Sequence, residues 1–199
     1  AAVAVIVALI VGMGGGYAIG HSMKDDNDSS SSSSTSMMSE GDGTLVGGAL
    51  MVRDKDIVDN AANAKNVSTT VDLVKMAGLV DTLKGEGPFT VFGPNNDAYA
   101  KIDKATVESL QKPENVDMLK TILTYHVVPG TYTSADLRVM AQKGETLMTV
   151  QGQMLTPVLE GNMVAVKDAK GDVAEIETAD VISSNGVTHV IKSVLMPNS

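Results

Sequence analysis

A short run of residues that is closed by glycine and proline on both sides constrains the fold of this chain most. Residues 89–92 read Phe-Thr-Val-Phe, and they lie between Gly87-Pro88 and Gly93-Pro94. Aromatic and β-branched residues favour a strand, whereas the flanking pairs end it sharply. The next residues begin with Asn95, whose side chain can accept hydrogen bonds from the first turn of a helix. The sequence therefore predicts a buried strand that turns directly into a helix.

The composition excludes several classes of function. The 199 residues carry a formal net charge of −9 and include no cysteine. A nucleic-acid partner would require a basic surface, and none is predicted here. Without cysteine there is no disulfide framework, no thiolate nucleophile, no zinc–thiolate site and no lipid anchor on cysteine.

Residues 1–20 contain no charged side chain, and a helix of this length matches the hydrocarbon thickness of a bilayer. We interpret residues 1–23 as a transmembrane or signal-anchor helix that contacts the membrane through residues 1–20. A cleaved secretory signal is the alternative. Gly12, Gly16 and Gly20 share one helix face, a pattern that permits self-association, although it also fits a glycine-rich, poorly helical end.

Residues 24–44 form an acidic, serine-rich stretch that includes six consecutive serines from Ser29 to Ser34. Such a composition buries too little apolar surface to offset the entropy of ordering, so we expect a flexible linker. The acidic residues lack the spacing of an EF-hand loop, which favours a solvated linker over a calcium site.

The remaining residues, 45–199, are predicted to form one α+β domain. An extended arm over 44–52 is expected first. Apolar residues then recur at helical spacing, with Ser68 as a candidate cap, and helices are expected over 56–64, 68–77, 79–83, 105–110, 114–124 and from 133 onward. Past Thr146 the period becomes two, which predicts strands over 147–150, 154–158, 163–166, 173–176 and 187–196.

Three motifs in order resemble the fasciclin (FAS1) family. The stretch 87–99 is similar to the first signature of that family, although Gly93 stands where alanine is usual. Residues 125–130 resemble its Tyr-His motif, and residues 184–197 resemble its second signature. The resemblance implies a single fasciclin-like domain of short helices packed on a β-sandwich or wedge, preceded here by the apolar N-terminal helix.

The resemblance also assigns roles to particular residues. It implies binding positions at Tyr125, His126, Asp180 and Val181. It implies that His126 braces the first signature near Asn95, Asn96 or Asp97. Structural motif positions are Phe89, Thr90, Phe92, Pro94, Asn96, Asn185, Gly186 and His189.

The residues alone indicate no catalytic centre. Of the three histidines, only His126 and His189 lie in the predicted domain, and each follows or lies within an apolar segment, which is typical of a buried structural histidine. No Gly-x-Ser-x-Gly elbow and no phosphate-binding loop are present. The twelve methionines fall mostly at core spacing and are interpreted as packing residues. We therefore predict no enzyme activity, no metal and no cofactor.

These features favour a surface-displayed or secreted protein, membrane-anchored or periplasmic, that mediates cell adhesion or protein–protein interaction. The expected partner is a cell-surface or matrix protein, and no nucleic acid. Two alternatives remain open. One is a filament subunit assembled through the N-terminal apolar helix, and the other is a periplasmic module that binds a small ligand or lipid.

Overall fold

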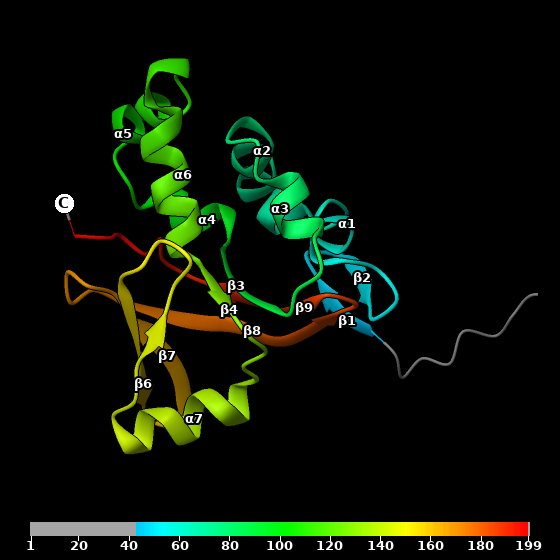
Figure 1. Ribbon diagram of the computed structural model, residues 1–199, viewed down its shortest axis with the longest axis vertical. Coiled ribbons are helices and arrows are strands. Elements are labelled where there is room, and N and C mark those ends of the chain that lie inside the picture. The colour runs from blue at the N-terminus through cyan, green and yellow to red at the C-terminus, as the bar shows by residue number, and fades with distance from the viewer. Residues whose placement is uncertain (1–42, 199) are drawn as a thin grey trace, which may run out of the picture. The chain divides into compact units, whose positions relative to one another are not determined.

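The computed structural model describes residues 43–198, in which most helices precede most strands (Figure 1). The strands are β1 (Gly43–Val46), β2 (Ala49–Val52), β3 (Phe89–Pro94), β4 (Val127–Pro129), β5 (Leu147–Met148), β6 (Met154–Glu160), β7 (Met163–Lys167), β8 (Val173–Ser183) and β9 (Gly186–Ile191). The α-helices are α1 (Ile57–Ala61), α2 (Ser68–Met76), α3 (Val80–Lys84), α4 (Asn96–Ala100), α5 (Lys104–Leu110), α6 (Val116–Tyr125) and α7 (Ser134–Lys143), with 3₁₀ turns at Lys65–Val67 and Pro113–Asn115.

Seven strands form one sheet in the order β4-β3-β9-β8-β7-β6-β5. Strand β3 pairs antiparallel with β4 and parallel with β9, with Phe92 opposite His189. The sheet bends so that its two edge strands approach each other. The N–H of Val150, just beyond β5, donates to the carbonyl of Val127 in β4 at 2.8 Å. The result is a nearly closed wedge, and the predicted α+β class with helices packed on a wedge is confirmed.

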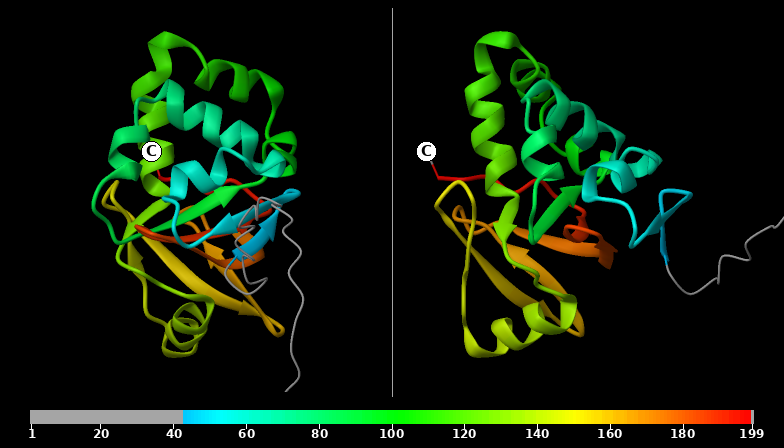
Figure 2. Two further views of the ribbon diagram at one scale, coloured as in Figure 1. Left: turned by 90° about the vertical axis from the view of Figure 1, so that its right-hand side faces the viewer. Right: turned by 45° about the vertical axis from the view of Figure 1, so that its right-hand side comes forward.

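Helices cover the two sides of this wedge unequally. Helices α1–α6 gather on one side of β3 and β4, whereas α7 lies at the opposite end against β6 and β7 (Figures 1 and 2). Alternate side chains of β3 therefore enter different cores. Val91 packs among the helices, and Phe92 packs inside the wedge. A third cluster, with Val46 and Met51, joins the β1–β2 hairpin to Val181 and Val190.

Two of the predicted helices begin with a side-chain cap, one of them at the expected Asn95. The Oδ1 of Asn95 accepts from the N–H of Ala98 at 2.8 Å, so β3 does turn directly into α4. Thr133 caps α7 and forms a capping box with Asp136. Ser68 is not a cap, because α2 continues from the preceding 3₁₀ turn and Ser68 is its first helical residue.

Three of the elements that differ from the prediction are the N-terminal arm, β8 and β9. The expected arm over 44–52 is a hairpin, since β1 and β2 turn at Gly47-Gly48 with positive φ at both glycines. Strand β8 runs on to Ser183, because register shifts between Ile176 and Val181 break its alternation without ending it. Strand β9 ends at Ile191, and farther along the chain the N–H groups of Leu195 and Met196 donate to side chains instead of to a neighbouring strand.

The predictions for the N-terminal part lie outside the described residues. They concern the helix over 1–23, the glycines Gly12, Gly16 and Gly20, and nearly all of the linker over 24–44. Between residues 43 and 198, every helix is too short or too polar to cross a bilayer.

Candidate binding hollow

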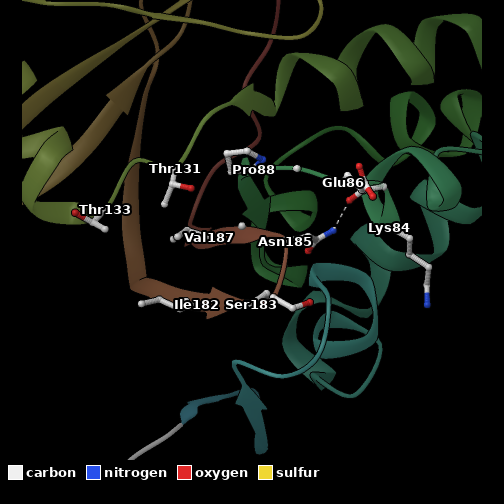
Figure 3. Close-up of a pocket in the computed structure, with 13 residues that line it drawn as sticks. Lys84, Glu86, Pro88, Thr131, Thr133, Ile182, Ser183, Asn185 and Val187 are labelled. Atoms are coloured by element: carbon white, nitrogen blue, oxygen red, sulfur yellow. Dashed lines mark hydrogen bonds between the residues drawn. The ribbon is translucent and has the colours of Figure 1, made fainter.

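A hollow of about 650 Å³ opens at one end of the central strands, where three connecting segments meet (Figure 3). Its walls come from the α3–β3 connection (84–88), from the segment after β4 that includes Thr131 and Thr133, and from the β8–β9 turn (182–187). Two of these segments belong to the motifs over 87–99 and 184–197. The motifs therefore converge on one surface feature, which we call the hollow.

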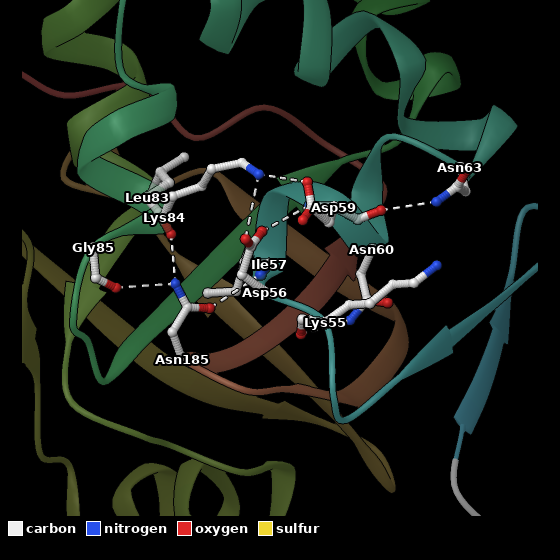
Figure 4. Close-up of polar contacts among 10 residues, drawn as sticks. All are labelled: Lys55, Asp56, Ile57, Asp59, Asn60, Asn63, Leu83, Lys84, Gly85 and Asn185. Atoms are coloured by element: carbon white, nitrogen blue, oxygen red, sulfur yellow. Dashed lines mark hydrogen bonds and ion pairs between the residues drawn. The ribbon is translucent and has the colours of Figure 1, made fainter.

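Asn185 fastens the β8–β9 turn to the helical side of the hollow. Its side-chain amide donates to the carbonyl of Leu83 at 2.7 Å and to that of Gly85 at 3.2 Å. Its Oδ1 accepts from the N–H of Ile57 at 3.0 Å, so one side chain joins three segments (Figure 4). These bonds hold the β8–β9 turn against α1 and the α3–β3 connection, and so fix two walls of the hollow relative to each other.

Two glycines allow the walls to come together at backbone distance. A Cβ atom on Gly87 would collide with the carbonyl oxygen of Asn185, and one on Gly186 would collide with that of Phe89. The N–H of Phe89 also donates to Asn185 O at 3.1 Å. Any side chain at either glycine would push β3 and the β8–β9 turn apart.

The side chain of Lys84, which borders the hollow, is directed away from it. Lys84 Nζ lies 2.5 Å from a carboxylate oxygen of Asp59 and 3.4 Å from one of Asp56, and Figures 3 and 4 show its side chain pointing outward. The hydrogen bond from Lys84 holds the pKa of Asp59 below its usual value, and the bond to Asp59 raises the pKa of Lys84. Exposed Glu86, Thr131 and Ser184 line the rim. This arrangement offers hydrogen-bonding groups and no paired acid and base.

A polar cluster built on His189 supports the strand beside the hollow. Asp180 has φ of 57°, the only positive φ at a non-glycine residue between 43 and 198. Its carboxylate accepts from Ser134 N at 2.6 Å and from Ser134 Oγ at 2.5 Å, which ties β8 to the start of α7. The N–H of Asp180 donates to Nδ1 of His189 at 3.3 Å, and Nε2 of His189 bonds the carbonyl of Tyr132 at 2.8 Å. Burial lowers the pKa of His189, which remains a neutral imidazole.

His126 occupies an equivalent environment at the end of α6. Its Nδ1 bonds the carbonyl of Ile122 at 2.8 Å, and its Nε2 accepts from the N–H of Leu195 at 3.0 Å. Complete burial lowers the pKa of His126 to about 4. The neighbouring Tyr125 is also buried, and its hydroxyl donates to Met154 O and accepts from Ala169 N. Both residues hold distant segments of the wedge together.

Comparison with known proteins agrees with the motifs that build this hollow. The model of the fasciclin domain matches residues 65–197. The chain belongs to the fasciclin family. This fasciclin domain is 49% identical over 143 residues to Protein sll1483 of Synechocystis sp., with 71% of this chain and 73% of that relative covered. Uncharacterized protein sll1735 of the same organism is 38% identical over 146 residues, which cover 71% of this chain and 97% of that relative.

A solved FAS1 domain pair from the insect cell adhesion molecule fasciclin I has the same fold as this fasciclin domain. The TM-score is 0.66 at 22% identity, and the match covers 73% of this chain and 52% of that chain. Our chain therefore spans about half the length of the solved pair.

The fasciclin domain places the expected binding residues mostly beneath its surface. Tyr125, His126 and Val181 are at most 3% exposed, and only Asp180 is partly exposed. A partner would contact the three buried side chains only if the local structure opened. Their binding role stays a prediction.

The hydrogen bonds of His126 correct one expectation. Its ring contacts Ile122 and Leu195, and it makes none of its hydrogen bonds with Asn95, Asn96 or Asp97. Only its backbone meets the first signature, where its carbonyl accepts from Phe92 N at 2.9 Å. The reason is geometric, because the end of α6 points the ring toward the C-terminal segment.

The structural motif residues occupy the junctions of the domain. Thr90 is buried and its Oγ1 donates to Gly130 O at 2.7 Å while accepting from Tyr132 N at 2.9 Å. Asn96 connects α4 to the N-terminal end of α2 by accepting from Thr69 N at 3.1 Å. Phe92 stacks on His189 with ring centroids 5.6 Å apart. Phe89 and Pro94 mark the two ends of β3, and Asn185 and Gly186 shape the hollow.

Sequence reasoning missed the rim residues Glu86, Thr131 and Ser184. They are ordinary polar residues in loops, and although Ser184 begins the stretch 184–197, no pattern indicates that the three share a site. The available signal was indirect, since the glycines at 85, 87 and 186 indicate tight backbone contacts near a shared surface. In the described part of the chain, no group of three or more potential ligand side chains is arranged to hold a metal ion.

Proposed function

We propose that this fasciclin-domain protein is displayed outside the membrane and binds a protein partner through the hollow, as a cell-adhesion or surface-interaction module. The observation that carries the proposal is the construction of the hollow. Asn185, Gly87 and Gly186 fix its walls from three distant segments, whereas the rim exposes polar side chains that make no contribution to the core. Rigid walls favour binding because little entropy is lost when a partner orders them.

The family relationship supports the same assignment. The solved domain pair of this fold comes from a cell adhesion molecule. Both histidines of the domain are engaged by backbone groups through both ring nitrogens, and neither is left to transfer a proton. The uncharged segment 1–20 supports attachment of the domain to a membrane.

Site-directed photo-cross-linking tests the role of the hollow. A benzophenone amino acid is placed at Thr131 or Ser184 on the rim, or at exposed Lys120 on α6 as the control, and the protein is incubated with a cell-surface extract. We expect one partner of the same mass to be captured from both rim positions and not from position 120. Equal capture at all three positions, or none at the rim, would contradict the proposal.

Protease treatment of intact cells tests the display of the domain separately. We expect an epitope-tagged domain to be degraded by protease added outside, while a cytoplasmic marker survives. Protection of the domain in cells whose outer surface is accessible would exclude surface display, whatever the hollow binds.

A further inference from the structure

A second cavity, of about 50 Å³, lies between the helical side of the domain and the sheet. Helices α1 and α2 form one wall, and strands β3 and β9 form the other. The side chains that face it include Val58, Val71, Val74, Val91 and Val190. It lies on the opposite side of the sheet from the core of the wedge that holds Phe92. We call this cavity the seam.

The seam lies where two hydrophobic clusters meet without filling the space between them. Val74 and Val91 belong to the cluster beneath the helices, whereas Met51 and Val190 belong to the cluster beneath the β1–β2 hairpin. The seam is partly open to the surface. It is therefore an accessible apolar pocket at the border of two hydrophobic clusters.

One position in β3 accounts for much of this space. Gly93 lines the seam, and a Cβ atom added there would meet only Cγ2 of Thr188, at 3.7 Å, which is ordinary van der Waals contact. A methyl group would thus fit at position 93 without strain.

The wall of the seam restricts the chemistry of a ligand. It presents no polar surface to the cavity. Its Thr70 is already engaged, because Oγ1 donates to Pro94 O at 2.7 Å and lies 3.1 Å from the hydroxyl of Tyr99. A polar ligand would give up hydrogen bonds to water and regain none. Apolar cavities stay dry and accept apolar molecules, and one of about 150 Å³ accepts benzene.

We propose that the seam is a binding site for a small, uncharged hydrocarbon ligand, smaller than benzene, and that Gly93 keeps the site open. This site is separate from the hollow and does not depend on the proposed adhesive function. Binding is favoured because the side chains that line the seam gain van der Waals contacts with the ligand that they otherwise lack.

Xenon and cyclopropane are the probes for the test. The purified full chain is labelled with ¹³C at its valine and leucine methyl groups, and methyl spectra are recorded at increasing gas pressure. We expect saturable shift changes at Val71, Val74, Val91 and Val190, and none at Val164 or Leu155 in the wedge. Changes spread evenly over both sets of methyl groups, or changes that do not saturate, would overturn the proposal.

Two variants make the test specific. Gly93→Ala fills the seam and should weaken binding of both gases by about tenfold or more, the equivalent of about 1.4 kcal/mol. Thr188→Val keeps the shape of the wall and should bind within about twofold of the wild-type chain. Equal affinity of Gly93→Ala and wild type would overturn the assignment. If Gly93→Ala fails to fold, Val71→Ala enlarges the same cavity and must strengthen xenon binding; no gain there would also refute the site.

Discussion

The two buried histidines are surrounded by the same chemistry but connect different parts of the molecule. In both, one ring nitrogen accepts from a backbone N–H and the other bonds a backbone carbonyl. His126 joins α6 to the C-terminal segment at Leu195, whereas His189 joins the loop at Tyr132 to the irregular part of β8 at Asp180. The His126 ring therefore connects distant parts of the wedge, whereas the His189 ring holds together segments that lie beside the hollow.

Acidification tests what the two histidines share. The pKa of each is lowered by burial, to about 4 for His126, from an unfolded value near 6.5. Their contribution to stability is complete above pH 6.5 and is lost as the pH falls toward the folded pKa. We expect the free energy of unfolding to fall as the pH drops from 6.5 to 5, with a slope that approaches about 1.4 kcal/mol per pH unit for His126 and a further loss of the same sign from His189.

Denaturant titrations at pH 7, 6 and 5 measure this slope. This range avoids the carboxylates with lowered pKa, such as Asp136 and Glu175, whose contributions are lost at lower pH. A stability that stays constant over this interval would show that the histidines titrate normally in the folded domain.

Replacing His126 by alanine tests the difference between the two regions. The change leaves the N–H of Leu195 and the carbonyl of Ile122 without partners in the core, which costs about 1–3 kcal/mol, and it adds the cost of a cavity. We expect a lower melting temperature, measured by circular dichroism, with loss of order at residues 195–198. His189→Ala is the matched comparison, and its amide shift changes should instead concentrate near Tyr132 and Asp180.

Phe92→Leu removes a ring contact of His189 and none of the ring contacts of His126. The Phe92 ring stacks on His189 at an interplanar angle of 24°, while His126 makes its aromatic contact with Tyr125. Loss of the aromatic pair and of buried volume should lower stability by roughly 1–2 kcal/mol. We expect the titration shift of the His189 ring in NMR spectra to move and that of His126 to stay unchanged. Equal movement of both would contradict their independence.

Asp180→Asn gives the smallest expected effect. The variant keeps the shape of the side chain, but one of the two carboxylate oxygens that accept from Ser134 becomes an NH2 donor and the other loses its charge, so we expect a loss of about 0.5–1.5 kcal/mol. Hydrogen exchange should become faster at the first turn of α7 and stay constant at Leu195. Ser134→Ala, which removes only the Oγ bond, is the control and should show part of the same effect.

The sequence predicted mainly those features of the fold that depend on residues close together in the chain. Gly87-Pro88 precedes the start of β3, Asn95 caps α4, and the helix expected from residue 133 begins there, all through interactions within a few residues. Gly93-Pro94 does not end the strand as expected, because both residues pair with β9. The continuation of β8 past Ile176 was not predicted, because Asp180 is stabilised there by Ser134 from another element. The partner of His126 was missed for the same reason. The rim of the hollow depends on three segments far apart in sequence, which no single pattern records.

The parallel pairing of β3 with β9 has a consequence for the synthesis of the protein. Residues 89–94 lie between β4 and the last strand of the domain, residues 186–191. Until nearly all of the domain has been synthesised, the apolar residues of β3 therefore lack β9, the strand that pairs with them along their full length. Pairing over such a separation is slow to form and exposes strand edges meanwhile. We infer that this domain folds only after its synthesis is almost complete, and that nascent chains lacking β9 are natural targets for chaperones.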